Sequence, residues 1–342
     1  MDLFLFHKEE YNRLYNCTTY DVNDIPIESR RRPLLGWIFI ISFFVLEALY
    51  IPCVLSISKR LRYASFKFMF YIGIGDLIAL WVSGFLTGYF ALTGAVFCSH
   101  PTVIYIAGNI GIGCWYFETL AAILLAFNRC VEVWSPHLAR RMFQDNLIWL
   151  WLLPVTLYAL LGVFFANPGI FSSIYFAWFF NPHIGYIDDV HGVYTNVFHS
   201  IHNVIVCVGL SILYVIFCIT LALKRNHYQQ QAQTSRKSRM PFIQVFLITA
   251  VNFIASSVYL SMNFIPISEA LIVTGSIMWF LAHGIPPVIY LTMNATVRRD
   301  CHRYWLKCLN IRNIQIAVSV PTAAGLSTIQ QSLATRPLDS SM

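Results

Sequence analysis

Charge is scarce in this chain. Asp, Glu, Lys and Arg together make up 11% of its 342 residues, against roughly 25% in soluble domains. No Lys or Arg occurs from 68 to 128, from 142 to 223 or from 240 to 297. A soluble domain of this length would lack the polar residues to cover its surface. The composition therefore points to a membrane protein.

Several other signals are missing. The nine cysteines are scattered, no CxxC occurs, and no Cys/His set has the spacing of metal ligands, which argues against a disulfide scaffold and a zinc site. The basic residues interrupt apolar runs and do not gather beside aromatic platforms, so the net charge of +7 does not indicate a nucleic acid partner. The apolar stretch 1–6 ends too early for a signal peptide.

Long hydrophobic runs fill the gaps between the charges. Hydrophobic residues make up 57% of the chain, and the mean hydropathy is +0.61. A helix needs about 20 apolar residues to cross a bilayer. Seven runs reach that length: 34–57, 66–92, 103–133, 147–166, 194–223, 242–264 and 269–293. Because the period-two alternation of a barrel is absent, the sequence predicts an all-α fold, a seven-transmembrane helix bundle.

The basic residues set the orientation of the bundle. With the N-terminus outside, every inner segment carries basic residues, whereas the outer loops (93–102, 167–193 and 265–268) carry none. Arg30, Arg31 and Arg32 conflict with this orientation, because they precede the first span on the outer side. The asymmetry of the whole chain nevertheless predicts an outer N-terminus.

This topology divides the chain into segments. They are an extracellular N-terminal tail (1–33), the seven-transmembrane domain (34–293), an amphipathic cytoplasmic helix (294–312) and a disordered cytoplasmic tail (313–342). The outer loop 167–193 is long enough to fold over the mouth of a pocket.

Two segments outside the bilayer carry candidate modification sites. Cys301 and Cys308 lie on the apolar face of the predicted amphipathic helix, where they either accept palmitate or are ordinary apolar-face residues. Asn16 begins a glycosylation sequon on the outer tail. A second sequon begins at Asn294, but the topology places it in the cytosol, where it is not used.

Short motifs resemble those of rhodopsin-like G protein-coupled receptors. Asn128-Arg129-Cys130, with Pro136 seven residues after the Arg, is similar to the Asp/Glu-Arg-Tyr motif at the inner end of the third span. Pro287 and Tyr290 are similar to the Pro and Tyr of the NPxxY motif, and Asp76 matches the buried aspartate of the second span.

Longer stretches resemble the class T serpentine chemoreceptor-like receptors of nematodes. They are Tyr15-Asn16-Cys17-Thr18, Tyr50-Ile51-Pro52-Cys53, Met69 to Asp76, Phe97-Cys98, Asn128 to Glu132, Trp178 to Pro182 and Pro286-Pro287. The resemblance runs from about residue 15 to 310. It implies a plasma-membrane receptor, expected in sensory-neuron cilia, whose partners are a small-molecule ligand, a heterotrimeric G protein and the lipid bilayer. It implies neither a cofactor nor an enzyme activity.

Departures from the rhodopsin-like pattern concern its inner motif and its disulfide. Asn128 replaces the acidic residue, so Glu132, three residues after Arg129, is the expected ion-pair partner. The candidates for G protein coupling are then Arg129, Asn128, Glu132, Pro136 and Tyr290. The alternative for Arg129 is a snorkelling side chain that anchors the helix in the membrane. The long outer loop has no Cys. Cys17 and Cys98 are the two cysteines of the outer face, and they either form a disulfide or remain free thiols.

Ionisable residues at membrane depth are candidates for function. Glu47, Asp76, Glu118 and His283 each lie about ten residues from the inner end of a span, or ~15 Å, so one buried polar cluster is expected. It is either a cation- or proton-sensitive switch or a set of neutral carboxyl groups that hold helices together.

Other polar and aromatic residues lie in the outer half of the spans. Trp115, Tyr116, His199, His202, Tyr259, Asn263 and Trp279 either line a ligand pocket or pack in the core. The His199/His202 spacing offers no third ligand, so we predict no metal site. A chemosensory receptor is the leading interpretation. The alternative is a transporter or channel with a midplane carboxylate site, although inverted repeats are not evident.

Overall fold

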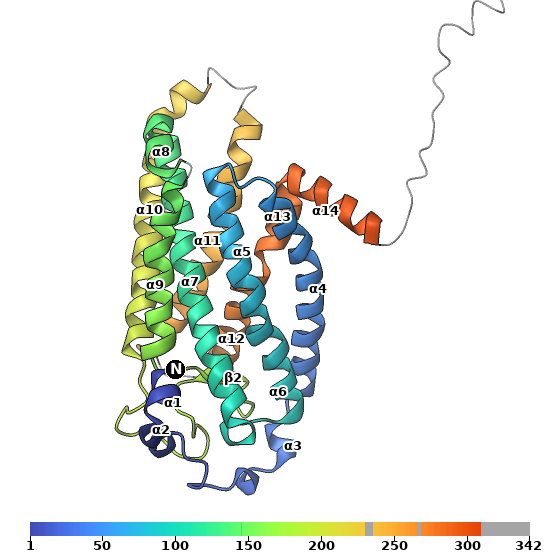
Figure 1. Ribbon diagram of the computed structural model, residues 1–342, viewed down its shortest axis with the longest axis vertical. Helices are drawn as coiled ribbons and strands as arrows, with labels where there is room; N and C mark the ends of the chain where they lie inside the picture. The colour runs from blue at the N-terminus through green and yellow to red at the C-terminus, as the bar shows by residue number, and fades with distance from the viewer. Residues whose placement is uncertain (145, 230–234, 266–267, 309–342) are drawn as a thin grey trace, which may run out of the picture. The chain divides into compact units, whose positions relative to one another are not determined.

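Seven membrane spans form the body of the protein in a computed structural model (Figure 1), which describes residues 1–144, 146–229, 235–265 and 268–308. Among these residues, six helices are long and apolar enough to cross a membrane, and a bent pair of helices makes the seventh span. The predicted seven-helix fold is therefore confirmed. Residues Met1–His302 form one compact unit.

The spans begin and end close to the predicted limits. They are α4 (Pro33–Ser58), α5 (Ala64–Leu80) with η2 (Trp81–Leu86) and α6 (Thr87–Thr93), α7 (Pro101–Trp134), α9 (Leu147–Phe165), α10 (Val197–Gln229), α11 (Ser235–Ser261), and α12 (Glu269–Gly284) with α13 (Pro286–Met293). Helix α7 is central, because it packs against α5, α9, α10 and α11 (Figure 1).

Two spans are not continuous α-helices, contrary to the prediction. The second span changes to a π-helical turn at η2 before it continues as α6. The seventh span bends by 44° between α12 and α13. Pro286 and Pro287 follow the bend, and proline lacks the N–H that would continue the hydrogen-bond pattern. Both spans therefore have a built-in irregularity at membrane depth.

The N-terminal tail is folded. It contains α1 (Asp2–Phe6), α2 (Lys8–Leu14), η1 (Val22–Asp24) and α3 (Ile27–Arg30). The rings of Phe4, Tyr11 and Tyr15 pack against Tyr105 of α7, with centroids 5.6, 5.0 and 4.9 Å away. These aromatic contacts attach the tail to the outer end of the central span.

A disulfide also attaches the tail. Cys17 is bonded to Cys98 of η3 (Phe97–Ser99), and the two Cα atoms are 5.4 Å apart. The disulfide prediction is confirmed, and the alternative of two free thiols is wrong. Because both cysteines lie at the end of the bundle that carries the tail, that end is the outer end in the predicted topology.

The outer arginines that conflict with the charge rule have structural roles. Arg30 is buried, and its guanidinium donates to the carbonyls of Ile25 and Gly94 at 2.9 and 2.7 Å. Arg32 donates to the carbonyl of Ile174 and pairs with Glu269, at 2.7 and 2.8 Å. These positive charges are used to join outer segments, which explains why they occur on this side.

The long outer loop folds over the bundle, as its length led us to expect, and it does so as a β-hairpin, which the all-α prediction did not include. Strands β1 (Ile170–Ser172) and β2 (Ala177–Phe179) pair antiparallel, and the turn between them holds Phe176 at a φ of 55°. The Phe176 carbonyl accepts a hydrogen bond from Ser276 of α12 at 3.0 Å. The Trp178 indole donates to Thr87 of α6 at 2.8 Å. The hairpin is thus fixed to two different spans.

The hairpin also lies directly on α7 at a pair of glycines. A Cβ atom on Gly108 would come within 1.6 Å of the carbonyl oxygen of Gly169. Only glycine has room at this position, so the distance between the hairpin backbone and the central span is set by a residue without a side chain.

The inner end carries α8 (Pro136–Phe143) and α14 (Ala295–Cys308). Asn294 accepts hydrogen bonds from the backbone N–H groups of Thr296 and Val297, each at 3.2 Å, so its side chain caps α14. The thiol of Cys301 is buried 3.7 Å from that of Cys53 on α4.

The packing of α14 decides the accessibility of Cys301. The prediction that Cys301 is available for palmitoylation is wrong, because the packing against α4 encloses it. The Cys308 side chain and residues 309–342, including the predicted disordered tail, lie outside the described part of the chain.

Candidate functional site

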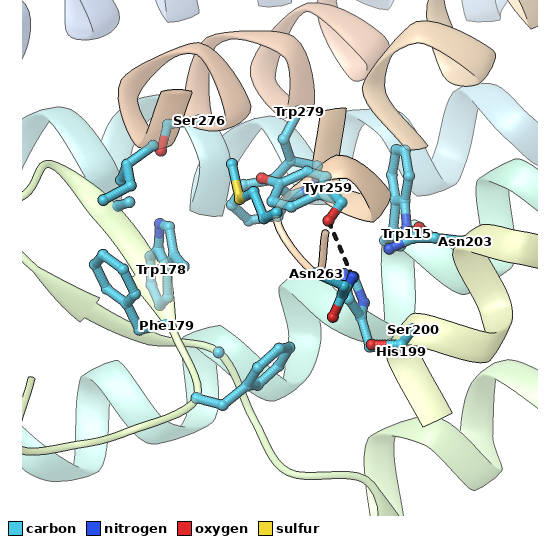
Figure 2. Close-up of a pocket in the computed structure, with 15 residues that line it drawn as sticks. Trp115, Trp178, Phe179, His199, Ser200, Asn203, Tyr259, Asn263, Ser276 and Trp279 are labelled. Carbon is cyan, nitrogen blue, oxygen red and sulfur yellow. Dashed lines mark hydrogen bonds between the residues drawn. The ribbon is translucent and has the colours of Figure 1, made fainter. Parts of the chain in front are cut away.

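A pocket opens at the outer end of the bundle (Figure 2). Its volume is about 250 Å³, and α7, α10, α11, α12 and the hairpin line it. Five of the seven residues predicted for a ligand pocket belong to its lining, namely Trp115, His199, Tyr259, Asn263 and Trp279. These are five of the ten lining residues that lie outside the loop 167–193.

Tyr116 and His202, the other two, do not line the pocket. Both are buried behind its wall, with their rings 4.5 Å apart. The imidazole of His202 is hydrogen-bonded to Thr119 and Tyr158, at 2.8 and 3.2 Å. The prediction was wrong for these two residues because their helical positions face neighbouring spans and not the cavity.

The hairpin supplies the part of the pocket that sequence reasoning missed. Trp178, Phe179 and Phe180 all line it, and Figure 2 shows Trp178 and Phe179 on the side opposite His199. The sequence did contain a signal for this wall. Three consecutive aromatic residues in a loop that faces water are expected to pack against an apolar surface, here that of the pocket.

Polar atoms are few in this pocket. The indole of Trp115 donates to the side-chain oxygen of Asn203 at 3.1 Å. The Nδ1 atom of His199 is buried without a hydrogen-bond partner. The His199 ring lies edge-to-face with Phe180 and Tyr259, with centroids 5.4 and 5.7 Å away. One imidazole is therefore held in place by aromatic rings while its ring nitrogen stays unpaired.

The two tryptophans at the deep end of the pocket form its floor. The rings of Trp115 and Trp279 lie 6.1 and 6.3 Å from the ring of His283, between centroids. His283 itself is not part of the lining. The two tryptophans thus lie between the pocket and His283, and they contact the His283 ring from the pocket side.

That buried polar group connects five spans, namely α4, α5, α7, α11 and α12. His283 Nδ1 lies 2.8 Å from the Asp76 carboxylate, whose other oxygen accepts a hydrogen bond from Tyr50. Glu118 accepts a hydrogen bond from Asn252 at 2.7 Å. Ligand atoms of Asp76, Glu118 and His283 all lie within 4.8 Å of one another. The arrangement could hold one cation, because a carboxylate oxygen of Glu118 and Nε2 of His283 have no partner.

Glu47 is not part of this group, which corrects the prediction of a four-residue cluster. It is only partly buried on α4, and its Oε1 atom has no hydrogen-bond partner. Tyr50, three residues later on the same helix, points at Asp76 instead. Equal depth in the membrane did not decide the contact, because Tyr50 lies about 60° around the helix and ~4.5 Å along it from Glu47, and that offset is enough to bring it to Asp76.

A second cavity, of about 630 Å³, opens at the inner end. Four of the five residues predicted for coupling line it, namely Asn128, Arg129, Glu132 and Pro136. Arg129 pairs with Glu132 at 2.5 Å, as the spacing predicted, and its guanidinium lies 5.7 Å from the centre of the Phe242 ring. Tyr290 is fully buried outside this lining, and its hydroxyl has no partner.

The glycosylation candidate lies on the folded tail. The side-chain oxygen of Asn16 accepts hydrogen bonds from the backbone N–H and the hydroxyl of Thr18, both at 2.9 Å. The sequon therefore forms a local turn beside the disulfide. Glycosylation of Asn16 stays a prediction.

Comparisons with known proteins now identify the family. The sequence model of the serpentine type 7TM GPCR chemoreceptor Srt family matches residues 1–315. The chain belongs to the Srt family. Serpentine receptor class T-55 of Caenorhabditis elegans is 25% identical over 283 residues, which cover 82% of this chain and 72% of that receptor.

Membership of the Srt family confirms the resemblance seen in the sequence motifs. The chain is a multi-pass membrane protein of a chemoreceptor family, and that family is one of receptors and not of enzymes.

Proposed function

We propose that this Srt protein is a chemosensory receptor of the plasma membrane, located in sensory-neuron cilia. It binds a small molecule in the outer pocket and activates a heterotrimeric G protein at the inner cavity. One observation carries the proposal. The floor of the outer pocket touches His283, and His283 belongs to the polar group that joins the spans between the two cavities.

Helix α7 links the two cavities directly. Trp115 belongs to the outer lining and Arg129 to the inner lining, and they are separated by about 21 Å along the helix. Helix α11 makes the same connection, with Tyr259 in the outer pocket and Gln244 in the inner cavity. A ligand that binds one arrangement of these helices more tightly shifts the population toward it.

The inner cavity suits the end of a partner helix. Arg62, Arg129 and Arg140 line it, whereas Glu132 is its one acidic residue among the described lining. A helix C-terminus carries partial negative charge and unpaired carbonyls, so this cavity favours a helix-in-groove contact with a G protein α-subunit. Separation of Arg129 from Glu132 would free the guanidinium for that contact.

A cell assay tests the proposal. The receptor is expressed with a promiscuous G protein, and pools of small molecules are screened for a second-messenger response. We expect at least one response, which Arg129→Ala abolishes at unchanged surface expression. Arg141→Ala is the matched control, because Arg141 is exposed outside the cavity lining.

The same cells distinguish the alternative function. A ligand-dependent ion current that persists in Arg129→Ala and without any G protein would support a transporter or channel. Such a result would contradict receptor coupling while leaving the family assignment unaffected.

A further inference from the structure

The outer pocket lacks formal charge. None of its described lining residues is Asp, Glu, Lys or Arg. Transfer of a charged ligand into such a site costs several kcal/mol that no counter-ion offsets. The composition of the walls therefore disfavours both anions and cations.

The acidic residues nearest to the pocket are engaged elsewhere. Asp76 and Glu118 are fully buried in the polar group beneath the tryptophan floor, and neither belongs to the lining. Glu269, at the start of α12, pairs with Arg32 at 2.8 Å and is also outside the lining. A ligand cation in the pocket would meet no carboxylate of the described lining.

The aromatic walls favour a flat ring. Trp178 and Trp279 are edge-to-face with centroids 6.2 Å apart, and Trp115 and Tyr259 are edge-to-face at 6.4 Å. A ligand ring that inserts between such walls gains both apolar contact and favourable ring geometry. An aromatic cage also attracts cations, by about 2 kcal/mol or more when the site is desolvated, so a quaternary ammonium probe is the most stringent test of a preference for uncharged ligands.

The volume limits the size of the ligand. An apolar cavity of roughly 150 Å³ holds benzene, and drug-sized ligands occupy at least about 300 Å³. At about 250 Å³, this pocket takes more than one bare ring but less than a drug-sized molecule. Two fused rings, or one ring with a short substituent, fit that limit.

His199 supplies the polar anchor. His199 lines the pocket, its Nδ1 atom is enclosed, and neither ring nitrogen is hydrogen-bonded within the described part of the chain, so Nε2 is the atom that a ligand reaches. Phe180 and Tyr259 contact the ring from two sides. A neutral imidazole offers one donor and one acceptor. A buried polar atom without a partner is costly, so a ligand that supplies one hydrogen bond is preferred to a hydrocarbon of equal shape.

We propose that the outer pocket selects small, uncharged aromatic molecules that carry one hydrogen-bonding group, with His199 as the anchor. This inference rests on the proposed function only in taking the pocket as the ligand site. It adds the chemical class of the ligand and the residue that recognises the polar group.

A matched set of probes tests the ligand class on the purified full chain in lipid nanodiscs. The probes are 2-naphthol, 2-methylnaphthalene, 2-naphthoate and trimethyl(2-naphthyl)ammonium, with empty nanodiscs subtracted. Equilibrium dialysis should show 2-naphthol binding at least tenfold more tightly than either charged probe. His199→Phe should weaken 2-naphthol about five- to tenfold, for the loss of one buried hydrogen bond, and leave 2-methylnaphthalene unchanged.

Two variants of α10 establish where the probes bind. Ser200 lines the pocket, whereas Ser211 is exposed on the same helix. Ser200→Trp should fill the cavity and remove binding, and Ser211→Trp should retain it. The proposal is overturned if a charged probe binds as tightly as 2-naphthol in a manner sensitive to Ser200→Trp, or if no probe binds the folded protein.

The outcomes separate this inference from the proposed function, because binding is measured without a G protein. Binding as expected together with no coupling in any cell assay would reject the signalling role alone. Coupling driven by a charged ligand through this pocket would reject the ligand class alone.

Discussion

The imidazole of His283 on α12 lies 2.8 Å from the carboxylate of Asp76 on α5, and both side chains are fully buried. This pair joins the two irregular spans of the bundle. Asp76 precedes the π-helical turn at Trp81–Leu86, and His283 precedes the bend at Pro286. The contact therefore links the two spans at their irregularities, which are features typical of hinges.

A double-mutant cycle measures the strength of this pair. Asp76→Ala and His283→Ala should each lower the free energy of unfolding, and their combination should cost less than the sum by about 0.6–1.7 kcal/mol, the range for polar pairs between membrane helices. The matched control pairs Asp76→Ala with Ser83→Ala, because Ser83 bonds to a carbonyl of its own helical segment. That pair should be additive, and a coupling near zero for both pairs would contradict the linkage.

Glu132→Gln should raise basal signalling, because it releases Arg129 into the inner cavity. The ion pair is 44% exposed on the Glu132 side, so its loss is worth only about 0.3–0.5 kcal/mol. That corresponds to roughly a twofold rise in basal second messenger. Glu10→Gln is the control, because Glu10 and Arg13 form an ion pair of the same spacing at the outer end. A rise with Glu10→Gln as well would point to an effect on expression.

Arg30→Gln should destabilise the outer end of the receptor. Arg30 is buried and donates to two backbone carbonyls, and hydrogen bonds from a charged group contribute about 1.5–3 kcal/mol. We expect the free energy of unfolding to fall by about 2–3 kcal/mol. Arg31→Gln removes the same charge from an exposed position and should cost less than about 0.5 kcal/mol. If both variants lost the same free energy of unfolding, the charge of the arginine and not its buried hydrogen bonds would account for the loss.

Acidification should loosen the outer loop through His183. Burial lowers the pKa of His183, although its contact with the carbonyl of Leu14 opposes this shift. In acid, the unfolded chain therefore binds more protons than the folded chain does. The stability that His183 contributes is fully present above the ordinary histidine pKa of about 6.5, and it is lost as the pH falls below that value. The melting temperature should fall between about pH 7.5 and about pH 5.5. His183→Gln should reduce that fall, whereas His191→Gln, at an exposed position, should not.

The sequence predicted most of the architecture because lipid imposes strong constraints on composition. Most span limits lay within a few residues of their predicted positions, since basic residues mark the inner ends of the apolar runs. Arg129 and Glu132 were correctly paired, because spacing along one helix fixes their neighbourhood. Topology placed Cys17 and Cys98 on the outer face and left a disulfide as one of two alternatives, and the structure decides for the disulfide.

Contacts between helices were harder to predict. Glu47 and Tyr50 lie on one helix, and only the rotation of α4 decides that Tyr50 meets Asp76. Asn252 was not identified as the partner of Glu118, because the pairing depends on the packing of α11 against α7. The π-helical turn is not visible in the hydrophobic pattern. The bend of the seventh span was also not predicted, because the apolar run continues through it, although the pair Pro286-Pro287 is a signal for a break in a helix.

The contact between Gly108 and Gly169 affects the width of the outer pocket. Because the hairpin backbone lies against α7 at this point, any larger residue at Gly108 would lift the hairpin away from the bundle. Trp178 and its neighbours would move with it, and the pocket would widen while every lining side chain stayed the same. If the pocket binds a ligand as proposed, the spacing between these two backbones would change which molecules fit it, through Gly108, which is not part of the lining.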